Sequence, residues 1–311
     1  MRKQLVFGLL IVTVLLSMTM AACSINQTNA EQIALKYKYA DESLKIYGPY
    51  TYELNSYYVA EFYQVGDGDF TQGVLIINEE TGELLRDKEI AKRIFWVHFT
   101  VKNNNVLIGN HESLAEIYNR EASVGQKNVQ TIENASELMK NRNFEKMIEI
   151  EKKSTDTYAN LSETVSKIAV LEKKIEAGDR LYENAMEIKK LNDEYISLLE
   201  KLLGMDEEYK TQLAYYYDDI GHTPGYNSNR YSWDKSREEM FKTHDAVTEN
   251  RRDELELEKE NRKIGEEYIS SAVESIDQRI SETPDEQVPG FSLLFAICSM
   301  LIVGILIKRR N

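Results

Sequence analysis

Residues 158–202, YANLSETVSKIAVLEKKIEAGDRLYENAMEIKKLNDEYISLLEKL, decide the main part of the fold. Apolar side chains recur here at steps of three and four residues, the period of one face of an α-helix. The stripe consists of Tyr158, Leu161, Val165, Ile168, Leu171, Ile175, Ala185, Ile188, Leu191, Tyr195, Leu198 and Leu202. Because such a stripe needs a partner helix, the sequence predicts a coiled coil, with Gly178 and Gly204 as local bends.

The helical composition extends over residues 112–281, where charged residues dominate. A second periodic run covers residues 233–280. Between the two runs, residues 215–234 hold Gly221, Pro224 and Gly225, which predicts a reversal loop. We therefore expect a long antiparallel helical hairpin or a three-helix coiled coil, with residues 112–150 as the third helix. The stripe serves equally for pairing within one chain or for a homo-oligomer.

The region before the helices, residues 30–105, reads as a small α+β domain. A first helix is expected from Ala30 to about Leu44, ended by Gly48-Pro49. Strands are expected at residues 57–63, 74–77 and 83–86, with a hairpin turn at residues 66–69. A second short helix is expected at residues 88–99.

Residues 73–91 of this domain carry Ile76-Ile77-Asn78, the turn Thr81-Gly82-Glu83, and Asp87. This segment resembles PepSY domains, which commonly present a Thr-Gly-Glu turn between two strands. The resemblance implies an exported protein that restrains or chaperones a peptidase. It gives no functional residue that can be carried over.

The N-terminal residues 1–23 have the order of a secretory signal peptide: two basic residues, an apolar run, and small residues before Cys23. Met20-Ala21-Ala22-Cys23 also resembles the lipobox of exported lipoproteins, which makes Cys23 a candidate lipidation site. Cys23 and Cys298 are the only cysteines, so we expect neither a disulfide framework nor a cysteine-based metal site in the exported part.

The C-terminal residues predict a membrane anchor. A short polar linker at residues 282–290 precedes an uncharged run at residues 291–307, which as a helix is about 25 Å long. The basic tail at residues 308–311 favours the cytoplasmic side of the membrane.

This end of the chain resembles the PGF-CTERM sorting signal of archaeal surface proteins. The residues that carry the resemblance are Pro289, Gly290, Phe291, Lys308, Arg309 and Arg310. The family likeness implies cleavage by an archaeosortase, replacement of the tail by a lipid anchor, and a location at the cell surface in the S-layer environment. An ordinary single-pass anchor is the alternative.

The charge of the chain narrows the classes of partner. The formal net charge is −14, and all charged side chains of residues 1–23 and 291–311 are basic. The exported region is therefore strongly acidic, so we expect no binding to nucleic acid. Three sequons, at Asn26, Asn134 and Asn160, are candidate N-glycosylation sites of an exported chain.

The most distinctive local composition lies within the predicted reversal loop, where aromatic side chains alternate with carboxylates. The candidate partner-binding residues are Tyr215, Tyr216, Tyr217, Asp218, Asp219, Tyr226, Tyr231 and Trp233. Exposed aromatics beside carboxylates suit contact with a sugar or a protein. The alternative is that these side chains form an apolar cap on the hairpin.

The sequence offers no catalytic constellation and no cofactor-binding motif. The four histidines, His98, His111, His222 and His244, lack metal-ligand spacing, so we interpret them as structural or exposed. The leading expectation is a non-enzymatic, membrane-anchored, S-layer-associated surface protein whose helical rod presents the small domain to envelope proteins or glycans. The alternatives are a PepSY-like regulator of an exported peptidase and a surface enzyme whose acidic residues converge only in space.

Overall fold

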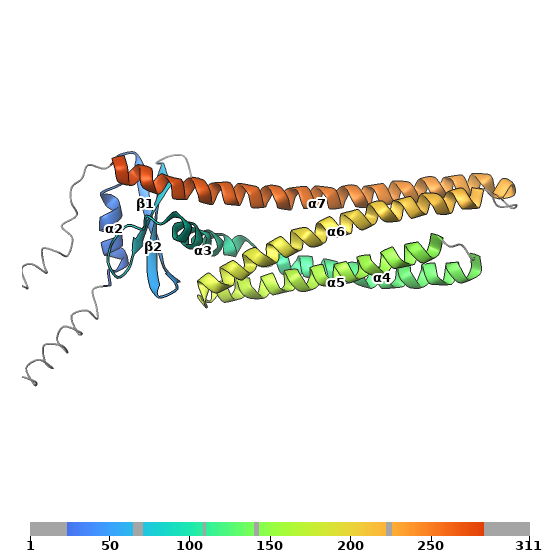
Figure 1. The fold of residues 1–311 in the computed structure, drawn as a ribbon, viewed down its shortest axis with the longest axis horizontal. Helices are drawn as coiled ribbons and strands as arrows, with labels where there is room; N and C mark the ends of the chain where they lie inside the picture. Colours follow the sequence, from blue (N-terminus) through green and yellow to red (C-terminus); the bar gives the residue numbers. More distant parts are fainter. Residues whose placement is uncertain (1–23, 65–70, 108–109, 140–142, 222–225, 283–311) are drawn as a thin grey trace, which may run out of the picture.

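The computed structural model describes residues 24–64, 71–107, 110–139, 143–221 and 226–282. The elements are, in order, α2 (Gln27–Leu35), β1 (Glu42–Tyr52), β2 (Asn55–Gln64), β3 (Thr71–Asn78), α3 (Lys88–Leu107), α4 (Asn110–Met139), α5 (Asn143–Glu176), α6 (Leu181–Gly221) and α7 (Tyr226–Glu282). Residues 24–107 form a head at one end, and α4 to α7 form a rod (Figure 1). A small antiparallel sheet followed by long helices confirms the predicted class in its coarse form.

The predicted signal peptide, the candidate lipidation residue Cys23 and the anchor all lie outside the described residues. The same holds for His222, for the turn expected at residues 66–69, and for the sorting residues Pro289, Gly290, Phe291, Lys308, Arg309 and Arg310. These features stay predictions from the sequence.

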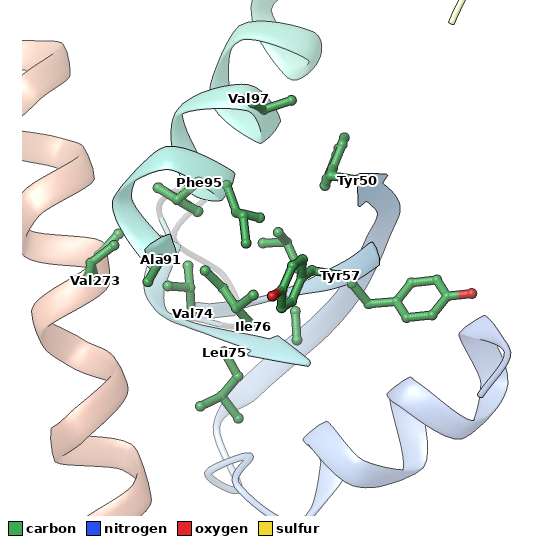
Figure 2. Packing of buried hydrophobic residues seen from close by; sticks show 14 of the residues in the cluster. Tyr50, Tyr57, Val74, Leu75, Ile76, Ala91, Phe95, Val97 and Val273 are labelled. Atoms are coloured by element: carbon green, nitrogen blue, oxygen red, sulfur yellow. The ribbon is translucent and has the colours of Figure 1, made fainter. Parts of the chain in front are cut away.

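The head is built around a three-stranded antiparallel sheet in the order β1-β2-β3. All residues of β2 from Tyr57 to Tyr63 are buried, because helices cover both faces of the sheet. Val74 and Ile76 point to the side of Phe95 on α3, whereas Leu75 points to the opposite side (Figure 2). The near-continuous apolar run of β3 follows from this double coverage.

The first helix is shorter than the sequence pattern predicts. α2 ends at Leu35, and residues 42–52 form β1, so the expectation of a helix reaching Leu44 is wrong. Gly48 and Pro49 lie inside this strand, next to a register shift between Tyr47 and Tyr50. Because β1 is an edge strand, it accommodates a proline that donates no ladder hydrogen bond.

The Thr-Gly-Glu segment forms the expected turn. The Asn78 amide donates to the Glu83 carbonyl at 2.9 Å, and the Leu85 amide donates to the Ile76 carbonyl at 2.8 Å. Gly82 has φ +72°, a left-handed conformation that glycine adopts without strain. Residues 84 and 85 thus lie beside β3, although Leu84 contributes only an isolated bridge to Ile77.

The rod contains four helices in the described ranges, where a hairpin or three helices were expected. Gly178 ends a helix instead of bending one: its φ is +74°, its amide donates to the Ile175 carbonyl, and the Asp179 amide donates to Lys174. These bonds form a helix C-cap around a left-handed glycine. The stripe of residues 158–202 therefore folds back on itself, and α5 packs against α6 within one chain.

α4 packs closely against α5 on the other side. A Cβ atom at Gly125 would lie 2.3 Å from Oγ1 of Thr155, so only glycine permits this approach of the two helices. The third helix expected over residues 112–150 is wrong in its bounds. Two helices cover this range, because α4 ends at Met139 and α5 begins at Asn143.

α7 runs back along the whole rod and ends against the head (Figure 1). Ile269, Ala272, Val273 and Ile276 are buried in the core of the head, and Figure 2 shows Val273 facing Ala91 of α3. Both ends of the described chain, at residues 24 and 282, therefore lie at the same end of the molecule, opposite the tip of the rod.

Candidate functional site

The aromatic and acidic residues singled out in the sequence gather at the tip of the rod. Tyr215 to Asp219 lie on the last turns of α6, and Tyr231 and Trp233 lie on the first turns of α7. Tyr226 is the first residue of α7. The predicted loop at residues 215–234 is thus helical in its described part, since α6 continues to Gly221 and α7 begins at Tyr226.

Part of this set turns inward and caps the rod. Tyr217 is buried with Phe144 and Leu213, and its hydroxyl lies 3.2 Å from Oγ of Ser236. The Tyr216 ring lies 5.0 Å from the Phe144 ring. Trp233 and Phe241 of α7 are half-buried against the same cluster. This group holds the ends of α5, α6 and α7 together, as the second interpretation of the sequence anticipated.

The other part faces solvent. Tyr231 is 83% exposed and Tyr215 is 54% exposed. Asp218 and Asp219 are exposed beside them. Arg237 of α7 is 3.5 Å from the Asp218 carboxylate, and Asn143 of α5 donates to Asp219 at 2.6 Å.

A shallow hollow of about 300 Å³ lies next to this surface and is lined by Asp234, Arg237, Glu238 and Phe241. The Arg237 guanidinium lies over the Phe241 ring at 5.8 Å from its centroid. Exposed phenol rings beside carboxylates and a guanidinium can accept apolar contact and hydrogen bonds together. The tip therefore has the chemistry of a contact surface for a protein or a glycan.

The head contains a buried polar network centred on Glu61 of β2. Its carboxylate is fully buried and lies 3.0 Å from Nε2 of His98 and 2.9 Å from Nζ of Lys102. The Tyr63 hydroxyl donates to the same carboxylate, and the Tyr50 hydroxyl lies 2.9 Å from Nδ1 of His98. Sequence reasoning missed this network, although a glutamate inside the apolar run YYVAEFY was its visible signal.

The charge state of Glu61 follows from these partners. Burial alone would raise the pKa of Glu61, but the hydrogen bonds and charges of His98, Tyr63 and Lys102 outweigh it and lower the pKa to about 2. The carboxylate is thus ionised and paired at neutral pH. The contacts of Glu61 with His98 and Lys102 tie the sheet to α3. Glu61 and His98 are both fully buried, so a substrate does not reach them.

A second polar network joins α7 to the rest of the rod. Arg251 donates to Asp206 of α6 and to the hydroxyl of Tyr158 on α5. One turn further along α7, the Tyr195 hydroxyl donates to Glu254 at 2.9 Å, and Tyr118 of α4 donates to the same carboxylate. Burial, with the neighbouring Tyr195 and Glu254, raises the pKa of Tyr118, which keeps this phenol protonated as a donor.

The remaining histidines of the described part are structural. His111 lies 2.7 Å from Glu172, a buried carboxylate, and the His244 ring stacks on Tyr209 at 5.9 Å. The described residues contain no group of three or more histidine, cysteine, aspartate or glutamate side chains able to hold a metal ion. The sequon residues Asn26, Asn134 and Asn160 are all exposed, and Asn26 also caps α2.

Comparison of the chain with protein-family models, with curated proteins and with solved structures finds no match. None of the helices within the described ranges combines the length and the apolar composition needed to cross a membrane.

Proposed function

We propose that this protein is a non-enzymatic, membrane-anchored cell-surface protein whose helical rod projects from the membrane and contacts an envelope protein or glycan at its tip. The anchor is the one predicted from residues 282–311, or a lipid at Cys23. The observation that carries the proposal is the position of both described chain ends at the head, opposite the tip.

The direction of the rod follows from the length of the connecting segments. Residues 283–290 link Glu282 to the predicted span, and eight extended residues reach at most about 28 Å. Three residues separate Cys23 from Gln27, which is about 10 Å. Either anchor holds the head next to the membrane. This order is the reverse of the expectation that the rod presents the head.

The length of the rod sets the distance between the membrane and the tip. α7 has 57 residues and is about 85 Å long. Residues 110–282 contain 38 acidic and 25 basic side chains, a net charge of −13. Anionic head groups repel such a surface, which favours a rod standing away from the membrane. Among the large apolar side chains described on the rod, Tyr231 at the tip is the most exposed and so the most available to a partner.

Photo-cross-linking on intact cells tests this proposal. A photoreactive phenylalanine replaces Tyr231 at the tip, with Val170 on the side of the rod as the matched control, since that side chain is 54% exposed. A third variant carries the probe at Leu54 of the head, which is 93% exposed. We expect discrete adducts with an envelope component from Tyr231 and none from Val170.

Other outcomes separate the rival functions. Adducts from Leu54 alone, joined to a peptidase, would replace the proposal by the PepSY-like regulator. Equal adducts from Tyr231 and Val170 would show contact along the whole rod and contradict a specific tip. Recovery of the full chain in the soluble fraction of lysed cells would contradict the anchor itself.

A further inference from the structure

We propose that the outer face of α2, with the segment that follows it, is a membrane-contact surface that rests on anionic lipid head groups. The inference rests on the proposed function, since it requires that the chain is anchored near its ends. It adds a second contact with the bilayer and assigns residues to it.

The position of α2 in the head determines which side chains face outward. α2 is the element furthest from the tip of the rod (Figure 1). Ala30 and Ala34 are fully buried against the sheet. The opposite face of this helix carries exposed polar, apolar and basic side chains and points away from the sheet. Its residues are Thr28, Gln32, Leu35 and Lys36.

The segment after α2 extends this surface. Leu35 is 48% exposed and Tyr39 is 42% exposed, although both are large apolar side chains. The Tyr39 hydroxyl donates to the carboxylate of Glu282, the last residue of α7. The surface therefore includes the point at which α7 leaves the head, and it lies on the side to which both predicted anchors connect.

Two lysines lie within this surface. Residues 32–40 contain Lys36 and Lys38 and no carboxylate, and three carboxylates border the segment: the exposed Glu31 and Asp41, and Glu282, which accepts from the Tyr39 hydroxyl. Lysines and a tyrosine beside an exposed leucine match the bilayer interface, where the ammonium groups meet lipid phosphates and the apolar parts enter the head-group layer. The strongly acidic rod lacks this match.

The expected strength of the contact depends on the anchor. Two apolar side chains and two lysines bind a bilayer weakly by themselves. A tether of a few residues raises their effective concentration at the membrane to the millimolar range, so a weak contact becomes populated. Such a contact would fix the orientation of the head, and with it the direction in which the rod projects.

Fluorescence of the reconstituted full chain tests the surface. Cys23→Ser and Cys298→Ser remove the natural thiols, and an environment-sensitive NBD label is attached at Leu35→Cys. The control label is attached at Val170→Cys on α5. The protein is inserted into vesicles of anionic lipid that carry a spin-label quencher at the head-group level. We expect loss of most of the emission at position 35 and little loss at position 170.

Charge reversal sharpens the result. Loss of one lysine near an anionic surface weakens the contact about fivefold. Lys36→Glu and Lys38→Glu each also add a carboxylate, so each should weaken it by more than this factor. The double variant should therefore recover most of the emission at position 35, as should vesicles of zwitterionic lipid alone.

The outcomes distinguish this inference from the proposed function. Vesicle flotation of the protein with an unquenched label at position 35 would overturn the membrane-contact surface and leave the anchor intact. Quenching at both positions would also overturn it, because the whole rod would then lie on the bilayer. Failure of the protein to float with the vesicles would contradict the anchor predicted at residues 291–307, because Cys23→Ser has already removed the alternative lipidation site.

Discussion

The α5–α6 seam and the α6–α7 seam are built from different side chains, although both join antiparallel helices of one rod. The first buries Leu161, Val165, Leu199 and Leu202. In the second, between residues 226 and 264 of α7, Thr248 and Leu255 are the only buried residues with described side chains. Its other contacts are of three kinds: the half-buried Trp233 and Phe241 at the tip, the partly buried hydrogen bonds of Arg251 and Glu254, and exposed ion pairs. The ion pairs are Arg262–Asp193, Lys259–Glu200, Arg252–Glu207, Asp245–Lys210 and Arg237–Asp218.

This difference shows how α7 is held. Apolar contact supplies most of the stability of the α5–α6 pair, whereas exposed ion pairs set the register of α7 and contribute little free energy. α7 compensates at its other end, where Val273 and Ile276 enter the core of the head. We infer that α7 is fixed most firmly at the head, and that along the rod it is held at fewer points, chiefly the Arg251 and Glu254 network and the cluster at the tip.

The largest expected effect is at the junction of α7 with the head. Arg279 and Glu42 form a buried ion pair, with 4% and 5% of their side chains exposed. Arg279→Met leaves the Glu42 carboxylate buried without its partner, and we expect a loss of about 3–5 kcal/mol in the free energy of unfolding. Chemical denaturation measures it. The double variant Glu42→Leu with Arg279→Met should recover much of the loss, and a double variant as unstable as the single one would contradict the buried-charge explanation.

The apolar seam is tested by Leu161→Ala. This side chain is fully buried between α5 and its neighbours, so the substitution should cost about 2–5 kcal/mol. Val170→Ala on the same helix is the control, because its exposed side chain should change the free energy of unfolding by no more than about 0.5 kcal/mol. Similar effects from the two substitutions would contradict the assigned packing.

Low pH should destabilise the head through Glu61. The pKa of Glu61 is lowered from 4.5 to about 2, so folding is favoured by the ionised form. The corresponding stability, about 3 kcal/mol, is fully present above the unfolded pKa and is lost as the pH falls from 4.5 towards 2. Unfolding followed by the near-ultraviolet signal over this range measures it. Glu61→Gln should flatten the pH dependence, and an unchanged slope would remove Glu61 as its source.

The smallest effect is expected from salt. At about 1 M NaCl the Debye length is about 3 Å, so exposed ion pairs are largely screened. Hydrogen exchange of residues 240–264 in α7 should become faster, while exchange of residues 158–175 in α5 stays constant. Lys167→Gln, which removes only an ion pair within α5, serves as the control for nonspecific effects. Equal acceleration in both helices would contradict the difference between the seams.

The sequence predicts the helices better than their connections. The stripe from Tyr158 to Leu202 matches most of the buried seam, but Leu198 is only half-buried and its neighbour Leu199 is the buried residue. The same stripe fits one long helix or two paired ones. Gly178 distinguishes these cases only through its left-handed conformation and its cap hydrogen bonds. Periodicity alone contains no information on where the chain turns.

The polar contacts could not be predicted for a different reason. Arg251 and Glu254 stand in a mostly charged segment, where charged side chains usually form a solvated surface, and only the approach of Tyr158 and Tyr118 makes them structural. The aromatic and acidic side chains of the tip were identified from the sequence. Which of the tyrosines point into the rod depends on the face of the helix that each occupies, and composition does not give this. Tyr215 and Tyr217 lie on opposite faces of α6 for this reason.

The most direct test of the account is the height of the two ends of the molecule above the membrane. A donor fluorophore is placed at Tyr231→Cys in the tip or at Leu54→Cys in the head of the full chain with its natural cysteines replaced by serine. The chain is inserted in vesicles that contain an acceptor lipid. We predict efficient energy transfer from position 54 and weak transfer from position 231, which lies about 76 Å along α7 from Glu282. Stronger transfer from position 231 than from position 54 would contradict the claim that the head stands at the membrane and the rod projects from it.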